Sequence, residues 1–332
     1  MEESLRPLDG VVLNFDANSV HVLNIALAFI MFGVALGIKF KDFKALIYSP
    51  KQVITGILSQ FIFLPALTFL FIILIKPSPT VALGMILVAA CPGGNISNFI
   101  SALANANTAL SVTLTAIATL AATFMTPLNF SFWGSLYIKY YSKVSAQGLL
   151  RPIEIEIFQV FQTVFILLGI PLILGLLFAH YLPKVTTKIK SPLNVISILV
   201  FLGIVVAALA SNFNHFLNYI HLIFLIVLVH NAIALISGFS LSTFAGISRP
   251  SRRTITIETG IQNSGLALAL IFNPKIFPPE LELGGMAMIA AWWGIWHIIS
   301  GLGIAFIWSR KHMIDEPAKL SIVSTNDSKS KL

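Results

Sequence analysis

Long apolar stretches separated by short polar connections run along almost the whole chain. A helix that crosses a bilayer needs roughly 20 largely apolar residues, and several stretches here reach that length with few or no charges. We therefore predict an all-α polytopic membrane protein with about nine transmembrane helices. The predicted crossings cover residues 19–38, 52–75, 80–104, 108–134, 155–181, 192–210, 216–244, 254–272 and 283–308.

The composition indicates that lipid is the main solvent of this protein. Only 10% of the 332 residues are charged and 57% are hydrophobic, whereas a soluble domain has about 25% charged residues. So few charges cannot cover a water-exposed surface, which excludes an ordinary soluble enzyme. The net charge of +8 is more typical of basic loops beside a bilayer than of a nucleic-acid partner. We expect no nucleic acid.

Lysine and arginine are unequally shared between the two sets of loops. The connections after the first, fifth and seventh crossings and the C-terminal tail hold 15 of the 21 Lys and Arg residues. Basic residues favour the cytoplasmic side, so we predict the N-terminus outside and the C-terminus inside the cell. The predicted organisation is an extracellular tail (residues 1–18), one transmembrane unit (residues 19–309) and a disordered cytoplasmic tail (residues 310–332).

Polar, glycine-containing runs interrupt the third and eighth predicted crossings. These runs are CPGGNISN, at 91–98, and ETGIQNSG, at 258–265. Unpaired backbone groups are costly in hydrocarbon, so such breaks persist only where protein or water covers them. Matching broken helices point to a transporter binding site, with helix N-termini facing an anion and freed carbonyls facing a cation. The alternative is a pair of Pro/Gly kinks with no function.

Glu258 is the only acidic residue deep inside a predicted crossing. A carboxylate at the bilayer centre costs roughly 2.5–3.5 kcal/mol on insertion scales, so its default interpretation is functional. The alternative is a structural ion pair with Arg252 or Arg253, one to two helical turns away.

Oxygen-bearing side chains accompany Glu258 at a similar depth. Hydroxyl, amide and carbonyl oxygens suit a hard cation such as Na⁺ better than a transition metal. A single Ser or Thr in a membrane helix usually bonds its own backbone, so the argument depends on several of them lying at one depth. The candidates are Gln60, Ser97, Asn98, Ser111, Thr115, Gln262 and Asn263.

The chain resembles the bile acid:sodium symporter family, which includes bacterial homologues of the apical sodium-dependent bile acid transporter. The resemblance covers residues 20–310 and is carried by IMFGVALGIKFKDF, ILSQFIFLPAL, ILVAACPGGNISN, ALSVTLT and TIETGIQNSGLALAL. It implies an inverted repeat, with a panel domain (crossings 1, 5 and 6) and a core domain (crossings 2–4 and 7–9). In the core, two broken helices cross near the membrane centre. Many bacterial members have one more helix before the first crossing found here.

The resemblance also implies two sodium sites that share Glu258. One carboxylate between two Na⁺ ions leaves a net charge of +1, which an anionic substrate would cancel. The first implied site consists of Ser97, Asn98, Ser111, Thr115 and Glu258. The second consists of Gln60, Glu258, Thr259, Ile261 and Gln262, with Thr259 and Ile261 offering backbone carbonyls.

The substrate positions implied by the resemblance are Asn95, Asn263, His297 and Ile298. An asparagine often follows the histidine in bacterial members, and Ile298 stands in its place here. Because this amide is missing, the resemblance does not identify a particular substrate for this chain.

We therefore expect a sodium-coupled symporter of an organic anion that works by alternating access, as a monomer in the cell membrane. Bile acids, pantoate-like anions and keto acids are all open as substrates. Alternatives are an exporter or a proton-coupled carrier on the same fold, or an anion receptor that transports nothing. No nucleophile–base pair or metal cluster indicates an enzyme.

Overall fold

The computed structural model describes residues 2–11, 17–38, 48–144, 156–211, 213–273, 275–277 and 281–310. These residues form helices and connecting turns, and no named strand occurs among them. Helices occupy each of the nine predicted segments. Their bounds are α2 Ala17–Ala35; α4 Pro50–Leu58, η3 Ser59–Phe63 and α5 Leu64–Ile75; α6 Pro79–Ala90 and α7 Ile96–Leu103; α8 Thr108–Val144; α9 Ile157–Val164, η4 Phe165–Gly169 and α10 Ile170–Tyr181; α11 Pro183–Ser211; α12 Phe213–Phe244; α13 Arg249–Gly260 and α14 Ser264–Ile271; and α15 Gly284–Ser309.

The helices carry the apolar surface of a protein that lies in lipid. Within the described residues, five helices are long and apolar enough to cross a bilayer, and two further apolar helices are shorter. The five are Pro50–Ile75, Thr108–Lys143, Ile157–Tyr181, Leu217–Phe244 and Gly284–Ser309. Large apolar side chains such as Leu74 and Phe158 are largely exposed on the outside of the bundle, which is stable only in an apolar solvent. The prediction of an all-α polytopic membrane protein is confirmed.

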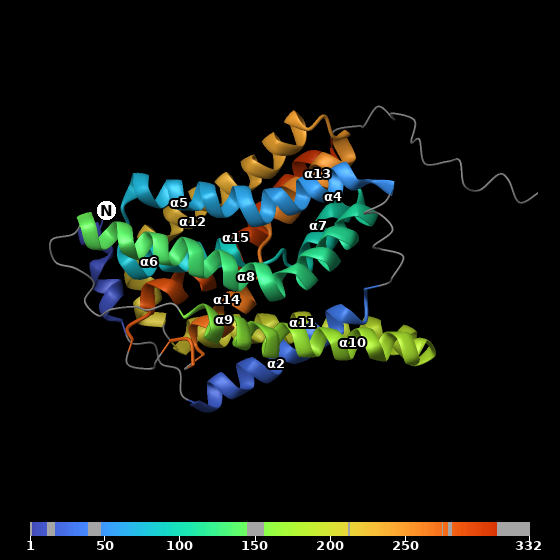
Figure 1. Cartoon of the computed structure of the whole chain (residues 1–332), viewed down its shortest axis with the longest axis horizontal. Helices are drawn as coiled ribbons and strands as arrows, with labels where there is room; N and C mark the ends of the chain where they lie inside the picture. Colours follow the sequence, from blue (N-terminus) through green and yellow to red (C-terminus); the bar gives the residue numbers. More distant parts are fainter. Residues whose placement is uncertain are drawn as a thin grey trace, which may run out of the picture.

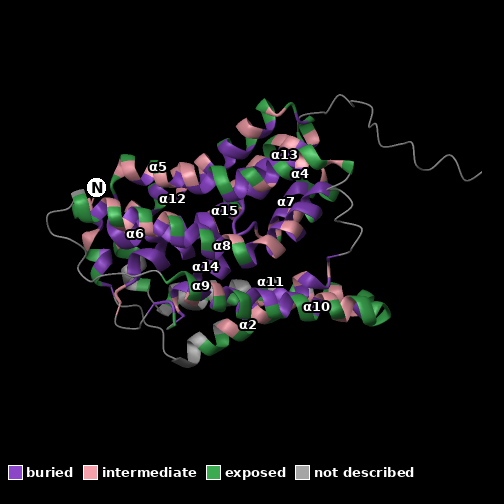
Figure 2. Cartoon of the chain, viewed as in Figure 1, coloured by how far each residue is buried: buried purple, intermediate pink, exposed green. Residues whose placement is uncertain are grey.

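Figure 1 shows the helices in two layers. Helix α2 packs against α10 and α11, and α9 continues into α10, so these helices form a three-segment layer. The remaining helices form the larger layer, in which α6 and α15 pack closely and α12 lies along α13. In Figure 2, α14 is coloured mostly as buried, whereas α10 carries exposed, intermediate and buried residues.

A proline shapes the second segment where a candidate side chain lies. Pro65 has no N–H, so the carbonyl of Phe61, four residues earlier, loses its helical partner. The amide of Asn129 on α8 replaces it and donates to that carbonyl at 3.0 Å. The backbone before the proline widens into the π-helical turn η3. Gln60 lies on this turn and is buried.

Both broken segments stop their first helix near the middle of the larger layer. Helix α6 ends before Cys91, whose φ of −73° and ψ of 155° are extended and which precedes Pro92. Helix α13 ends at Gly260, followed by extended Ile261. Helix α6 packs against α14, and α7 packs against α13. The two broken segments therefore cross each other in antiparallel directions.

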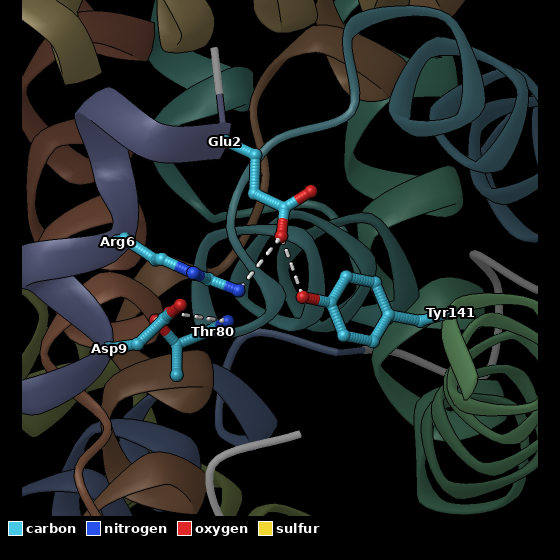
Figure 3. Close-up of polar contacts among 5 residues, drawn as sticks. All are labelled: Glu2, Arg6, Asp9, Thr80 and Tyr141. Carbon is cyan, nitrogen blue, oxygen red and sulfur yellow. Dashed lines mark hydrogen bonds and ion pairs between the residues drawn. The ribbon is translucent and has the colours of Figure 1, made fainter. Parts of the chain in front are cut away.

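The residues before the first crossing are folded onto the bundle, and Figure 3 shows their polar contacts. Leu5 and Leu8 are fully buried. The Asp9 carboxylate accepts hydrogen bonds from the backbone N–H and the hydroxyl of Thr80, at 3.0 and 2.5 Å. Tyr141, near the end of α8, donates to Glu2 at 2.7 Å. This N-terminal segment, residues 2–11, consists of α1 (Glu2–Leu5), η1 (Arg6–Gly10) and Val11.

The N-terminal segment belongs to the predicted extracellular tail (residues 1–18). It packs on the bundle and covers the end where α6 begins and α8 ends. The predicted C-terminal tail, apart from residue 310, lies outside the described residues.

Candidate functional site

The two helix breaks are joined to each other by backbone hydrogen bonds. The N–H of Gly94 donates to the carbonyl of Ile261 at 2.8 Å, and the N–H of Asn263 donates to the carbonyl of Pro92 at 2.8 Å. Together they form a short antiparallel bridge. Because these groups have no helical partners, the bridge satisfies polar atoms that would otherwise be unpaired in a dry interior. It also fixes the crossing point of the two segments.

Gly93 provides the room in which side chains from other helices meet this bridge. A Cβ at this position would lie 2.7 Å from Nε2 of Gln60 and 3.1 Å from Oε2 of Glu258. Only glycine allows the backbone of the first break to approach both groups so closely.

Glu258 lies at the end of α13 and its carboxylate is surrounded by hydroxyl donors. Ser97 and Ser111 each donate to Oε1 at 2.5 Å, and Thr115 lies 3.1 Å from both carboxylate oxygens. The side chain is only 3% exposed. The three donors come from α7 and α8, so one carboxylate joins α7, α8 and α13.

Neither nearby arginine pairs with this carboxylate. Arg252 donates to the carbonyl of Ile247 at 3.1 Å, and Arg253 donates to the carbonyl of Ala104 at 2.8 Å. Among the described residues, the ion pair found is Arg6–Glu2, far along the chain. The alternative interpretation of Glu258 as a structural ion pair with these arginines is therefore not supported, and its negative charge has no cationic side chain beside it.

The five residues of the first implied sodium site form one connected group. Thr115 links the carboxylate to Asn98, whose Oδ1 lies 3.4 Å from the threonine hydroxyl, and to Ser97 at 3.4 Å. Ser111 is joined through Glu258. The group offers hydroxyl, amide and carboxylate oxygens and no nitrogen or sulfur ligand, which is a donor set that fits a hard cation.

The residues of the second implied site also lie together, around the backbone at the end of α13. Gln60 donates to the backbone carbonyl of Glu258 at 3.2 Å, and Gln262 donates to the carbonyl of Thr259 at 2.8 Å. The Oε1 atom of Gln262 is buried and has no hydrogen-bond partner within the part of the chain that the structure describes. An unpaired acceptor in a buried position favours a cation there. The carbonyl of Ile261 accepts from Gly94 and has a second lone pair.

Two side chains of this region were missed by the sequence analysis. The hydroxyl of Ser59 lies 2.8 Å from that of Thr259, which in turn donates to the carbonyl of Ile255. The amide of Asn231 on α12 donates to the carbonyl of Gly260 at 2.7 Å. A buried asparagine in a membrane helix, opposite a break that frees carbonyls, is a signal that could have identified Asn231.

Two of the implied substrate residues, Asn95 and Asn263, lie at the starts of α7 and α14, and the other two lie on α15. Asn95 is exposed just before α7, and Asn263 is partly exposed and caps α14 by accepting from the N–H of Leu266 at 3.0 Å. His297 on α15 is buried, and its Nδ1 has no hydrogen-bond partner. Ile298 is partly exposed. The N-termini of α7 and α14 carry partial positive charge, which attracts an anion.

Helix α15 packs against the breaks close to His297. A Cβ on Gly301, one turn after the histidine, would lie 2.8 Å from Ile100 and 2.9 Å from Ile261. The helix that carries His297 and Ile298 is therefore in contact with the second break.

The chain is similar to a family of sodium symporters and to several curated proteins. The model of the Sodium Bile acid symporter family matches residues 24–219. The uncharacterized sodium-dependent transporter YocS of Bacillus subtilis (strain 168) is 34% identical over 292 residues, which are 87% of this chain and 83% of that protein. The probable sodium/metabolite cotransporter BASS2 of Oryza sativa subsp. japonica, a chloroplast protein, is 32% identical over 82% of this chain and 64% of its own length. The human P3 protein is 26% identical over 81% of this chain and 54% of its own length, so the chain spans less than two thirds of the rice and human proteins.

Proposed function

The chain belongs to the sodium bile acid symporter family, and from this membership and the geometry of the crossing we propose that it carries a small organic anion across the membrane together with sodium ions. The observation that carries the proposal is Glu258, a buried carboxylate that pairs with no cationic side chain among the described residues and is surrounded by uncharged hydroxyl and amide groups. A buried charge of this kind is unfavourable unless a cation accompanies it.

Two sodium ions are proposed as cargo. The first would be held by the carboxylate, hydroxyl and amide oxygens of Ser97, Asn98, Ser111, Thr115 and Glu258. The second would be held by Gln60, Glu258 and Gln262, with the backbone carbonyls of Thr259 and Ile261. The unpaired Oε1 of Gln262 supports this second site. Both ions together with one carboxylate give a net charge of +1.

That positive charge and the N-termini of α7 and α14 together favour an anionic substrate. We assign its contacts to Asn95, Asn263, His297 and Ile298. Ile298 presents a hydrocarbon surface at a position where an amide would offer a hydrogen bond, so the substrate meets at least one apolar wall. Bile acids, pantoate-like anions and keto acids are the candidate substrates.

Alternating access requires two bodies that move past each other. We assign the panel to the layer of α2, α9–α10 and α11, and the core to the larger layer. The packing of α2 on α10 and α11 supports this division. We place the N-terminus outside and the C-terminus in the cytoplasm of a cell-membrane protein that acts as a monomer.

A thermal unfolding screen in detergent tests the proposal. The purified chain is mixed with bile salts, pantoate or 2-keto acids, each in NaCl and in KCl at equal ionic strength. We expect one class of anion to raise the unfolding temperature only when Na⁺ is present, because coupled sites stabilise each other's ligands. Equal shifts in both salts, or a response to pH alone, would contradict sodium coupling and favour a proton-coupled or uncoupled carrier.

A further inference from the structure

The carbonyl of Gly260 loses its helical partner at the second break. In a continuous helix it would accept from the N–H of Ser264, but that N–H donates to the carbonyl of Gln262 at 3.0 Å. A freed carbonyl in a buried position needs another donor. This carbonyl lies between those of Thr259 and Ile261, the two backbone groups assigned to the second sodium site.

Asn231 supplies that donor. Its side-chain amide donates to the carbonyl of Gly260 at 2.7 Å, and the residue is 1% exposed. Because the carbonyl can only accept, the amide nitrogen must face Gly260 and the amide oxygen must face away. That oxygen accepts from the hydroxyl of Ser300 on α15, at 2.6 Å. The orientation of the asparagine is therefore fixed from both ends.

Gly260 permits this contact because it has no side chain. A Cβ there would lie 2.3 Å from Cδ2 of Leu235, one turn after Asn231 on α12. The absence of the Cβ lets α12 approach α13 closely enough for Asn231 to reach the carbonyl. Glycine also has the widest choice of backbone conformation, so the orientation of this peptide depends on an external contact.

Ser300 connects this arrangement to the helix assigned to the substrate. It lies three residues after His297, and its hydroxyl is also 3.1 Å from the carbonyl of His297. A continuous path thus runs from α15 through Asn231 on α12 to the end of α13.

We propose that Asn231 and Ser300 are a positioning pair that orients the Gly260 peptide, and with it the carbonyls of the second sodium site, according to the position of α15. The proposal rests on the proposed function. Asn231 and Ser300 contact neither ion directly. They act through the backbone at Gly260, so their loss weakens sodium binding without removing an assigned ligand.

Sodium titration of the purified full-length protein in detergent tests this proposal. NaCl replaces KCl at constant ionic strength, and the unfolding temperature gives an apparent Na⁺ midpoint. We expect Asn231→Ala and Ser300→Ala each to raise the midpoint about fivefold, the effect of losing one net hydrogen bond. The double variant should have the same Na⁺ midpoint as Asn231→Ala alone, because the two residues act as one unit.

Two further variants separate positioning from general destabilisation. Ser300→Thr keeps the hydroxyl and should restore a midpoint within about twofold of the original. Ser237→Ala, also on α12, removes a buried hydroxyl that bonds the carbonyl of Ala234 in its own helix, and it should leave the midpoint unchanged. If Asn231→Ala does not yield folded protein, Ser300→Ala and Ser300→Thr decide the question.

The outcomes distinguish this proposal from the proposed function. An original chain that gives no Na⁺ response overturns the proposed function and the positioning pair with it. A normal Na⁺ response in the original chain, with unchanged midpoints in Asn231→Ala and Ser300→Ala, overturns the positioning pair alone. So does a Ser300→Ala variant that unfolds earlier in KCl but keeps its midpoint, because that result indicates a purely structural contact.

Discussion

The two halves of each broken segment differ in chemistry although they are similar in shape. Helices α6 and α14 lie on one side of the crossing and read PTVALGMILVAA and SGLALALI. Helices α7 and α13 lie on the other side and read ISNFISAL and RPSRRTITIETG. Every residue of α6 and α14 is buried. The polar ligands assigned to sodium come from α7, α13 and their neighbours, with none from α6 or α14.

The proposed sodium sites therefore lie on one side of a crossing whose two broken segments have a similar backbone arrangement. Helix α7 follows its break and α13 precedes its break, so antiparallel crossing brings the two polar halves together. The apolar halves pack against α15 and α2 and close the other side of the crossing to water. If sodium binds on the side of α7 and α13 alone, α6 and α14 serve only to pack the crossing. Substitutions on the two sides should then have different effects, on sodium binding and on stability.

Glu258→Gln should have the largest effect on sodium binding, because it removes the negative charge at the centre of the hydroxyl groups on α7 and α8. Removing one partner of a buried charged pair costs roughly 3–5 kcal/mol, so we expect the apparent Na⁺ affinity to fall by at least about a hundredfold. Glu156→Gln is the matched control, since that side chain is exposed before α9 and should leave the affinity unchanged. A Glu258→Gln variant that kept full Na⁺-driven uptake in proteoliposomes would falsify the assignment.

The sequence predicted this polar side better than it predicted what surrounds it. The breaks and Glu258 could be predicted because glycines, amides and a carboxylate are conspicuous in an apolar segment. Helix ends were less accurate. Helix α8 continues ten residues beyond the predicted boundary at residue 134, and α11 begins at Pro183 rather than near residue 192. Polar residues can extend a membrane helix into the interface, and hydropathy alone places its end too early.

Contacts that depend on tertiary structure could not be predicted from the sequence pattern. Nothing in MEESLRPLDG indicates that Leu5 and Leu8 are buried, since two leucines in a short polar run are also typical of a tail. The partner of Asn231 is 29 residues away on another helix. Its importance depends on a carbonyl that the break frees, and hydrophobic periodicity carries no information on that pairing.

Two buried serines near the starts of α7 and α14 allow a direct comparison of these two helices. Ser97 is near the start of α7 and donates to Glu258, whereas Ser264 begins α14 and its hydroxyl bonds none of the described residues. We expect Ser97→Ala to raise the Na⁺ midpoint about tenfold or more, because hydrogen bonds to charged groups contribute about 1.5–3 kcal/mol. Ser264→Ala should change the midpoint by less than about twofold. Equal effects in the same titration would mean that both halves bind sodium.

Adding a methyl group to a glycine tests the effect of overpacking at the sodium ligands and, separately, in α6. Gly93→Ala should weaken the apparent Na⁺ affinity by at least about fivefold, because the added methyl displaces Gln60 or Glu258 and the lower end of the usual cost of overpacking is about 1 kcal/mol. In α6, a Cβ on Gly84 would lie 2.7 Å from Cα of Met286. Gly84→Ala should therefore lower the unfolding temperature in KCl and leave the Na⁺ midpoint unchanged.

Gly303→Ala is the control for both glycine variants, since no described atom outside its chain neighbours and the adjoining backbone of its own helix lies within 4 Å of the added methyl. It should change neither the unfolding temperature nor the midpoint appreciably. A Gly84→Ala variant that shifted the Na⁺ midpoint as much as Gly93→Ala would contradict the division into a binding half and a scaffold half.

Asp9→Asn should have the smallest effect on the Na⁺ midpoint, because Asp9 bonds Thr80 at the end of α6 that is distant from the crossing. Burial raises the pKa of the Asp9 carboxyl above its ordinary value of 3.8, and the hydrogen bonds from Thr80 oppose that rise. The folded chain therefore binds this proton more tightly than the unfolded chain. The resulting stabilisation is complete below pH 3.8 and is lost as the pH rises through the higher folded pKa.

Asparagine cannot ionise, so Asp9→Asn removes this pH dependence. Between pH 3.8 and the higher pKa of folded Asp9, the unfolding temperature of the original chain should fall more steeply with rising pH than that of the variant. Glu3→Gln, an exposed carboxyl in the same segment, should keep the original slope. The Na⁺ midpoint should stay within about twofold in both variants, because the twelve residues of α6 separate Asp9 from the crossing by about 18 Å. Equal pH slopes would show that Asp9 has the same pKa in the folded and unfolded chains, and a shifted midpoint would show that the apolar half transmits strain to the sodium sites.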